Sequence, residues 1–288
     1  MRRLDEPSGS TVSGGSEHRQ VSIFDHGLLY GDGIFEGIRA YNGQVFRLEA
    51  HLDRLYDSAR ALALTIPIDR KEFGAIIEEG VARSGLKEAY IRPIVTRGPG
   101  DMGIDPKKCA KPTVIVAVDS IKMWPTDRYE NGLALVTAGT PIPHREALCP
   151  RVKSLNYLPH VLAKHEANIA GADDAVMLDA SGHVCEATGM NIWMAKNGEL
   201  LTPPPHAGIL LGVTRALIFE LAAAAGHPAR ETMLNRYDLY TADEVFLCGT
   251  GAEVAPVRMY DGRPVGPGKP GPITQDIMRR FRALTRGD

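Results

Sequence analysis

The chain has few cysteines, and no spacing that would join them. Its 288 residues contain four, at positions 109, 149, 185 and 248, and none of these forms a C-x-x-C motif. We therefore expect no disulfide framework and no structural zinc, and we predict no other metal site. His160 and His165, five residues apart, are interpreted as packed or solvated side chains rather than as metal ligands. Scattered single cysteines are typical of a reducing compartment, which favours a cytoplasmic protein.

Long apolar runs and an excess of charge are also missing. No stretch reaches the roughly 18 apolar residues of a membrane-spanning helix, and the first 20 residues contain three arginines without the apolar core of a secretory signal. The formal net charge is −2, from 33 basic and 35 acidic residues that are interspersed along the chain. We expect neither a nucleic acid nor a membrane as partner, which leaves small molecules or other protein chains.

Hydrophobic residues make up 44% of the chain, enough for the cores of one large domain or two ordinary ones. We expect a disordered Ser/Gly-rich leader at residues 1–20, a small N-terminal domain at 21–120, a linker at 121–132 and a large domain at 133–288. The linker sequence IKMWPTDRYENG shows neither helical nor strand periodicity. Helices and strands that do not alternate regularly predict an α+β fold.

Periodicity predicts the main elements. Apolar residues recur from Leu48 to Leu62 at helical spacing, with Arg54 off that stripe, and a second helix is predicted at 70–84. Strands are expected at 88–96, 112–118, 133–136 and 244–248, and a tight hairpin at Asn197-Gly198. Further helices are predicted at 158–169, 214–225 and from 273, the first with Leu158, Val161, Leu162 and Ile169 on its apolar face.

Three stretches could bind an anion through backbone N–H groups: the helix start GVTR at 212–215, the loop at 249–251, and the glycines of YGDGIFEG. Each taken singly is explained as well by helix capping or a turn. GDGIFEG is not a dinucleotide-binding loop, because no βαβ unit surrounds it.

Lys153 lies between a Pro-Arg turn and a predicted helix. A lysine amine becomes a Schiff-base nucleophile only where its neighbours lower its pKa or a carbonyl cofactor is bound. A solvated surface lysine is the alternative that the residues themselves leave open.

Eight separated motifs resemble one family in order and spacing, over about residues 21 to 285. The family is that of the class IV (fold type IV) pyridoxal-phosphate aminotransferases, and the resemblance is greatest to branched-chain amino acid aminotransferases. The motifs are DHGLLYGDGIFEGIRAYNG, HLDRLYDSA, AYIRP, PRVKSLNYL, EATGMNIW, GILLGVTR, ADEVFLCGTGAEVAPV and GKPGPIT.

This resemblance implies a small N-terminal α/β domain, a larger C-terminal domain with a β-barrel-like core, and pyridoxal 5′-phosphate as cofactor. Lys153 would hold the cofactor as a Schiff base and move the proton between Cα and C4′, and Glu186 would keep its ring nitrogen protonated. The other implied cofactor contacts are Tyr157 at the phenolate oxygen, Leu210 against the ring, and Arg54, Val213, Thr214 and Thr250 at the phosphate.

The same resemblance implies a substrate pocket and a homodimer. The side-chain and carboxylate contacts would be Phe35, Gly37, Arg39, Tyr90, Arg92 and the amides of Gly251 and Ala252. Tyr30 and the loop around Ile104 would reach in from the second subunit, so a homodimer would be the minimal working unit.

The implied reaction transfers the amino group of L-leucine, L-isoleucine or L-valine to 2-oxoglutarate. A D-amino acid aminotransferase is the main alternative, disfavoured because AYIRP lacks an arginine-x-histidine clamp; an aminodeoxychorismate lyase and a cofactor-free scaffold are less favoured still. Four departures from the family pattern matter: the Ser/Gly-rich leader has no counterpart of the family's opening strand, Trp193 replaces a usual phenylalanine, and two more concern the site. Ala187 replaces a commoner glycine, so its methyl group is expected to crowd the ring, and the linker lacks the usual Pro-Trp-Gly-x-Tyr run.

Overall fold

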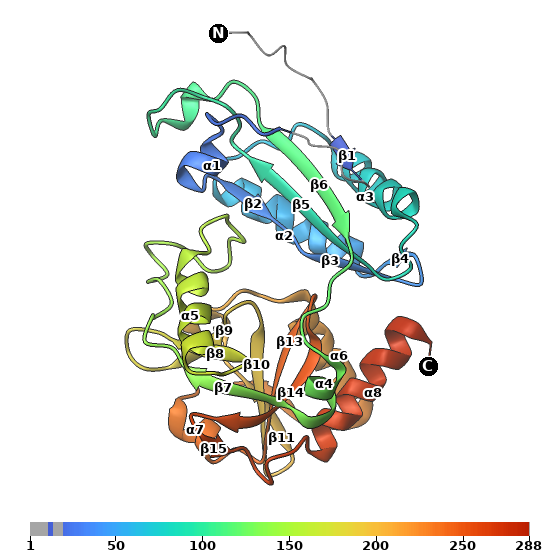
Figure 1. The fold of residues 1–288 in the computed structure, drawn as a ribbon, viewed down its shortest axis with the longest axis vertical. Coiled ribbons are helices and arrows are strands. Elements are labelled where there is room, and N and C mark those ends of the chain that lie inside the picture. The colour runs from blue at the N-terminus through green and yellow to red at the C-terminus, as the bar shows by residue number, and fades with distance from the viewer. Residues whose placement is uncertain (1–10, 14–19, 288) are drawn as a thin grey trace. The chain divides into compact units, whose positions relative to one another are not determined.

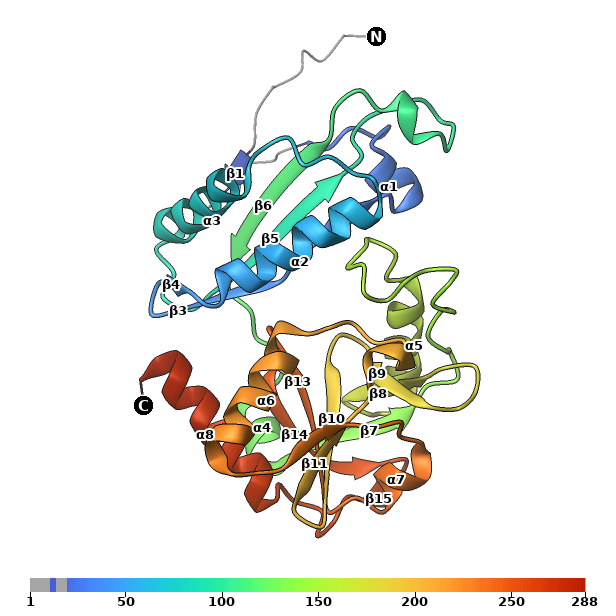
Figure 2. The ribbon, with the colours of Figure 1, turned by 180° about the vertical axis from the view of Figure 1, so that it is seen from behind.

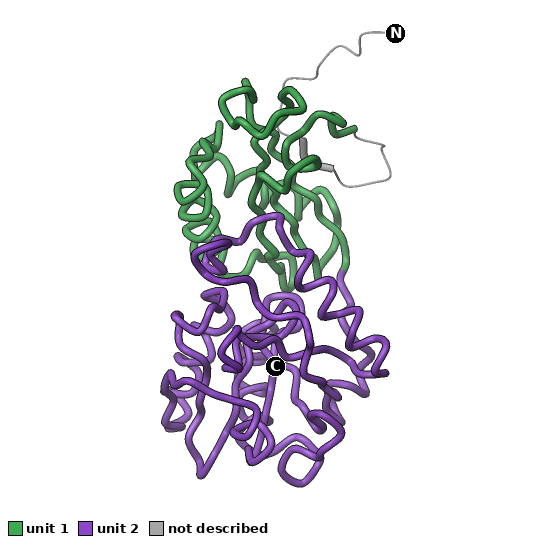
Figure 3. The backbone as a smooth tube through the Cα atoms, turned by 90° about the vertical axis from the view of Figure 1, so that its left-hand side faces the viewer, with its two compact units in different colours: residues 1–120 green, residues 121–288 purple. Residues whose placement is uncertain are grey.

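The computed structural model describes residues 11–13 and 20–287. The chain forms two compact units, residues 1–120 and 121–288, which are shown in separate colours in Figure 3. In the described part of the chain, no helix combines the length and the apolar character needed to cross a membrane.

The first unit is built on a mixed sheet. Its strand order is β1-β6-β5-β3-β4, with β2 also paired to β5. The strands are β1 (Thr11–Ser13), β2 (Gly33–Phe35), β3 (Ile38–Tyr41), β4 (Gln44–Val45), β5 (Ala89–Thr96) and β6 (Thr113–Asp119). The helices are α1 (His26–Tyr30), α2 (Leu48–Ala61) and α3 (Arg70–Ser84), with a short 3₁₀ turn at Pro106–Lys108.

Two short strands share one long neighbour. β2 pairs with the end of β5 and β3 with its beginning, and the two residues between them are Glu36 and Gly37. The Glu36 N–H still donates to the Pro93 carbonyl at 2.9 Å. This interruption places a carboxylate and a glycine at the middle of the sheet.

Helices α2 and α3 cover one face of this sheet (Figure 2). The predicted stripe of α2 is confirmed, because Leu52, Leu55 and Ala59 are buried. The bounds of α3 follow from its caps: the Asp69 side chain accepts from the Glu72 N–H, and Gly85 ends the helix in the left-handed region at φ 68°.

The second unit contains a larger sheet with the order β12-β11-β10-β13-β14-β7-β8-β9 and with β15 paired to β14 (Figure 1). β9 also contacts β10, so the sheet curls on itself. The strands are β7 (Leu133–Thr137), β8 (Asp174–Leu178), β9 (Val184–Ala187), β10 (Asn191–Lys196), β11 (Glu199–Thr202), β12 (Ala229–Glu231), β13 (Glu244–Gly249), β14 (Glu253–Tyr260) and β15 (Arg263–Pro264). The helices are α4 (Thr126–Asn131), α5 (Leu158–Ile169), α6 (Val213–Ala225), α7 (Arg236–Tyr240) and α8 (Pro272–Arg286), with a 3₁₀ turn at Pro205–Ala207.

The predicted hairpin at Asn197-Gly198 is confirmed. It joins the antiparallel strands β10 and β11, and both turn residues have positive φ, 50° and 82°. That backbone is what a type I′ turn requires, and asparagine and glycine adopt it with least strain.

Three sequence-based expectations need correction. Residues 121–132 belong to the second unit and contain α4, which packs on β14, so the segment is more ordered than its lack of periodicity indicated. Most of the predicted leader lies outside the described residues, but Thr11–Ser13 form β1, parallel to β6.

The third correction concerns the buried face of α5. The four residues predicted for its apolar face are exposed by 46% to 75%. The helix buries Ala163 and Ala167 instead, because small side chains allow it to lie close to the sheet.

Candidate functional site

Lys153 lies in the loop before α5, close to Tyr157. Its Nζ donates a hydrogen bond to the Tyr157 hydroxyl at 3.3 Å and lies 5.5 Å from the centre of that ring. Tyr157 occupies the N-cap position of α5, so the helix start holds the phenol in place. Lys153 is half-buried. It is therefore not the solvated surface lysine that the sequence left as an alternative.

Glu186 is a buried carboxylate on β9, 6% exposed. Its Oε2 accepts hydrogen bonds from the Asn191 side-chain amide at 3.1 Å and from the Leu210 N–H at 3.0 Å. Its Oε1 lies 3.8 Å from Nε2 of His160. Two neutral donors thus fix one oxygen, and the orientation of the carboxylate is set before any ligand binds.

Asn191 is a site residue that the sequence reasoning missed. Besides Glu186, its amide donates to the Leu210 carbonyl at 2.9 Å, and a Cβ added to Gly212 would lie only 2.1 Å from its Oδ1. Only glycine fits at position 212 beside this side chain. The sequence did contain a signal for Asn191. It begins an otherwise apolar strand in the motif EATGMNIW, and a buried amide needs hydrogen-bond partners.

Two of the three expected anion sites lie near Asn191. Gly212 begins α6 without a capping side chain, which leaves the N–H groups of the first turn directed out of the helix beside the buried Thr214. Asn191 is also the strand partner of Cys248. Cys248 is the penultimate residue of β13, so the 250–252 loop begins two residues after it. The third expected anion site, YGDGIFEG, belongs to the first unit.

Arg54, the predicted phosphate residue, is held by a carboxylate in the first unit. Its Nε and Nη2 donate to the two oxygens of Glu36 at 2.7 and 2.9 Å, and His51 Nδ1 lies 2.8 Å from the same group. Glu36 is 0% exposed and His51 1%. Burial opposes ionisation of Glu36, but the charge of Arg54 and the hydrogen bonds of both neighbours outweigh it and hold the pKa of this carboxyl well below its usual range.

The first unit also brings together the residues expected to contact the substrate. Tyr90 and Arg92 alternate along β5 with the fully buried Ile91, so both project from the opposite sheet face. Arg92 Nη2 donates to the Tyr90 hydroxyl at 2.9 Å, and its guanidinium lies 4.7 Å from the centre of the Phe35 ring. A Cβ at Gly37 would lie 2.1 Å from the Tyr90 hydroxyl. The missing side chain is what lets the phenol occupy this position.

Arg39 joins the same face. It is the strand partner of Tyr90, its Nη2 lies 3.3 Å from the Glu88 carboxylate, and its guanidinium lies 5.0 Å from the centre of the Tyr41 ring. The cluster therefore carries two guanidinium groups beside aromatic rings, a combination suited to an apolar group with a carboxylate.

Tyr30 and the loop around Ile104 meet at another edge of the first unit. The Tyr30 hydroxyl donates to the Met102 carbonyl, and Ile104 is 82% exposed. Sequence separation had hidden this contact between the end of α1 and the loop.

Ala187 follows Glu186 on β9. It is fully buried in the apolar core of the second unit, with Val176 and Met190. Successive residues of a strand point to opposite faces, so its methyl group points away from the side where Glu186 lies. Crowding of the cofactor ring by this methyl group stays a prediction.

The chain resembles known proteins over most of its length. Residues 33–260 match the family model described as amino-transferase class IV. A Methanocaldococcus jannaschii protein, provisionally named a branched-chain-amino-acid aminotransferase, is 48% identical over 92% of this chain and 91% of its own length. The solved Escherichia coli branched-chain amino acid aminotransferase superposes with a TM-score of 0.90, at 34% identity, over 93% of this chain and 90% of its own. The enzyme of the same name from Thermobaculum terrenum, solved in its PLP form, superposes with a TM-score of 0.83, at 28% identity, over 93% and 89%.

Proposed function

Because the chain belongs to the class IV amino-transferase family, we propose that it transfers the amino group of L-leucine, L-isoleucine or L-valine to 2-oxoglutarate, with pyridoxal 5′-phosphate as cofactor. The observation that carries this proposal is the placement of Lys153, Tyr157 and Glu186 together in one unit. The names of the similar proteins from Escherichia coli and Thermobaculum terrenum support the substrate class.

The residues of the second unit fit this cofactor. They supply an amine, a phenol 3.3 Å from it, a buried carboxylate, and the uncapped start of a helix with a buried threonine. These are the groups that would bind an aldehyde, a phenolate, a ring nitrogen and a phosphate. A Cβ atom at Gly212 would clash with the Asn191 side chain. The absence of a side chain at this position would let a ligand approach the backbone closely.

When bound, pyridoxal phosphate supplies an aldehyde that condenses with amines and a ring that withdraws electrons from the substrate Cα. Lys153 Nζ would bind the aldehyde carbon and, once displaced, take the proton from Cα. Tyr157 would orient the ring through its hydroxyl. Glu186 would hold the proton on the ring nitrogen. Its fixed Oε2 leaves Oε1 for that task.

For the phosphate we propose Arg54, the N–H of Val213, Thr214 and Thr250, with Leu210 against the ring. Glu36 holds Nε and one Nη of Arg54. The Arg54 guanidinium, a planar fork of N–H donors with a permanent positive charge, is the group that would supply charge to the phosphate. In the second unit, the start of α6 and the loop after β13 would offer neutral donors to a phosphate.

For the substrate we propose the cluster of Phe35, Gly37, Arg39, Tyr90 and Arg92 in the first unit. In the second unit we propose the Gly251 and Ala252 amides as substrate contacts. Rings line the apolar part, and the guanidinium groups would bind a carboxylate. A branched-chain amino acid has an aliphatic side chain for the rings and a charged carboxylate for the guanidinium groups.

We propose a homodimer in which Tyr30 and the Ile104 loop complete the partner's site. The surface around the Tyr30–Met102 contact supports it, because Ile23, Leu28, Met102 and Ile104 are each exposed by more than 60%. An exposed apolar cluster of this kind is typical of a protein interface. Mixing Lys153→Ala chains with Tyr30→Ala chains should restore activity that neither has alone, whereas no recovery would argue against a shared site.

We also propose a cytoplasmic location, which rests on the spacing of the cysteines. Cell fractionation with antibody detection would test it.

The decisive experiment compares L-leucine and D-leucine as donors to 2-oxoglutarate. The proposed function predicts glutamate formation with L-leucine and at least about tenfold less with the D-enantiomer, since the proposed guanidinium contacts would hold the carboxylate in one orientation. Preference for D-leucine would instead identify a D-amino acid aminotransferase. No transfer from either, together with no absorbance change on adding pyridoxal phosphate, would overturn the assignment.

A further inference from the structure

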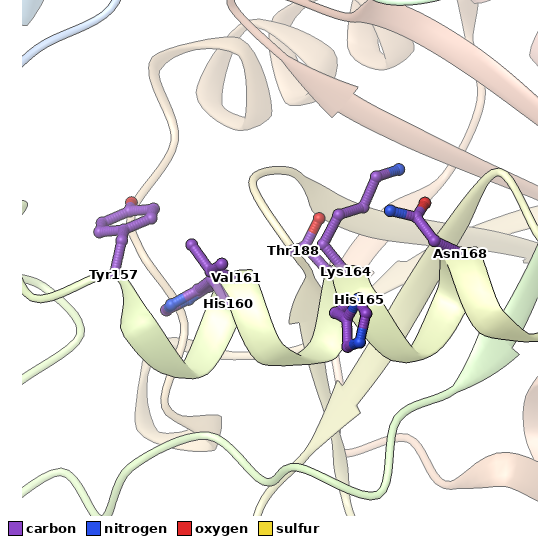
Figure 4. A pocket seen from close by; sticks show the side chains of 7 residues that line it. All are labelled: Tyr157, His160, Val161, Lys164, His165, Asn168 and Thr188. Atoms are coloured by element: carbon purple, nitrogen blue, oxygen red, sulfur yellow. The ribbon is translucent and has the colours of Figure 1, made fainter.

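His160 lies between two residues of the proposed site. It is the third residue of α5, and its imidazole stacks on the Tyr157 ring with centroids 4.5 Å apart and planes 23° from parallel. Its Nε2 lies 3.8 Å from Oε1 of Glu186, on β9. Figure 4 shows His160 beside Tyr157 on α5, at one end of a pocket of about 380 Å³ that Lys164, His165 and Thr188 also line.

The contact with Glu186 depends on the charge of His160. At 3.8 Å the two atoms are too far apart for a hydrogen bond between a neutral imidazole and a carboxylate. A protonated imidazole at that distance forms an ion pair, and the two side chains are only 15% and 8% exposed, so solvent screens their interaction weakly. Protonation of His160 thus changes the electrostatic environment of Glu186.

The other nitrogen of the imidazole makes no contact in the described part of the chain that would compete with Glu186. Nδ1 is buried and has no hydrogen-bond partner among the described residues. In contrast, Glu186 Oε2 is fixed by Asn191 and Leu210, so only Oε1 can respond to His160.

We propose that His160 is a positioning residue for the cofactor, an inference that rests on the proposed function. Its ring supports Tyr157, and its charge sets how strongly Glu186 attracts the proton on the ring nitrogen of pyridoxal phosphate. When His160 is neutral, Glu186 acts on the ring nitrogen alone. When His160 is protonated, it competes for the same carboxylate, and the ring-nitrogen proton is held less strongly.

Other titratable groups near His160 come from each adjoining element. Tyr157 is the N-cap residue of α5 and Lys164 lies within that helix, while Glu186 belongs to β9. Lys153 reaches Tyr157 from the preceding loop. Asp174 of β8 accepts a hydrogen bond from Thr188, which lines the same pocket. Glu186 is the one carboxylate for which a contact with the imidazole is found in the described residues.

The test uses the holoenzyme with pyridoxal phosphate and follows the absorbance of the bound cofactor from about pH 5.5 to 8.5, the range around the ordinary pKa of histidine. His160→Phe retains a ring that can stack on Tyr157 but cannot carry charge. We expect this variant to bind the cofactor and to shift the midpoint of the spectral transition by about half a pH unit or more.

His165→Phe is the matched control, because His165 lines the same pocket from the same helix and is exposed. It should titrate like the wild type. His160→Asn, which removes the stacking ring as well, should also weaken pyridoxal-phosphate affinity by about threefold or more, the effect of losing one aromatic contact.

Identical spectral midpoints for wild type and His160→Phe would overturn the role of His160, as would an equal shift in His165→Phe. A wild-type chain that shows no band of bound pyridoxal phosphate would overturn the proposed function, and this inference with it. A normal wild-type band with an unchanged His160→Phe midpoint overturns the role of His160 alone.

Discussion

The Glu36 carboxylate accepts two hydrogen bonds from the Arg54 guanidinium, at 2.7 and 2.9 Å, while it is completely buried beneath α2. Neither side chain would be stable at this depth without the other, because an isolated buried charge costs several kcal/mol. Glu36 lies where β2 gives way to β3, so the interruption of the sheet and the position of Arg54 depend on one another.

Glu36→Gln should lower the free energy of unfolding by about 3 kcal/mol, the low end for breaking a buried ion pair, since the amide still accepts one bond. Urea denaturation at neutral pH would measure it. Glu88→Gln removes the more exposed partner of Arg39 and should cost less than about 1 kcal/mol. Equal losses in the two variants would show that burial of the Glu36–Arg54 pair does not matter.

The same pair predicts a dependence of stability on acid. The pKa of Glu36 is lowered in the folded chain, so its contribution is complete above the unfolded pKa of about 4.3 and is lost as the pH falls below it. The stability difference between wild type and Glu36→Gln should therefore shrink from about pH 5 to pH 3. A difference that stays constant over this range would contradict the lowered pKa.

Lys153→Ala should abolish amino transfer and leave the far-ultraviolet circular dichroism unchanged, because Nζ is the proposed nucleophile and its hydrogen bond to Tyr157 adds little to stability. Lys164→Ala, on the neighbouring helix, is the control and should retain activity. Borohydride reduction followed by peptide mapping should place the cofactor adduct on residue 153. An adduct at another lysine would remove Lys153 from its role.

Gly37→Ala should lower kcat/KM about 100-fold, the scale for displacing a substrate-contacting group by about 1 Å. The new Cβ would lie 2.1 Å from the Tyr90 hydroxyl, which must move and release Arg92. Gly74→Ala is the matched control in α3: its Cβ would meet only Leu48 and Leu52 at 3.6 Å, and it should stabilise the helix by about 0.5–1 kcal/mol. Normal kinetics for Gly37→Ala would rule out the close approach of Tyr90.

The fold was predictable where local pattern and packing agree. The stripe of α2, the caps of α3 and the Asn197-Gly198 turn are encoded within a few residues, and the α+β, fold type IV architecture is confirmed by solved branched-chain aminotransferases. Prediction failed for α4 and for the buried face of α5. There the decisive contacts come from β14 and from a sheet whose strands are distant in sequence.

By itself, the sequence determined the family and supplied the candidate nucleophile and most of the other candidate site residues, because motif order and residue chemistry are properties of the linear chain. Only the tertiary structure decided that Glu36 secures Arg54, that Asn191 joins Glu186 to the start of α6, and that His160 lies between Tyr157 and Glu186. Each of these is a contact of one buried polar group with another from a different element. Such partners are chosen by how the elements pack, which residue spacing along the chain does not specify.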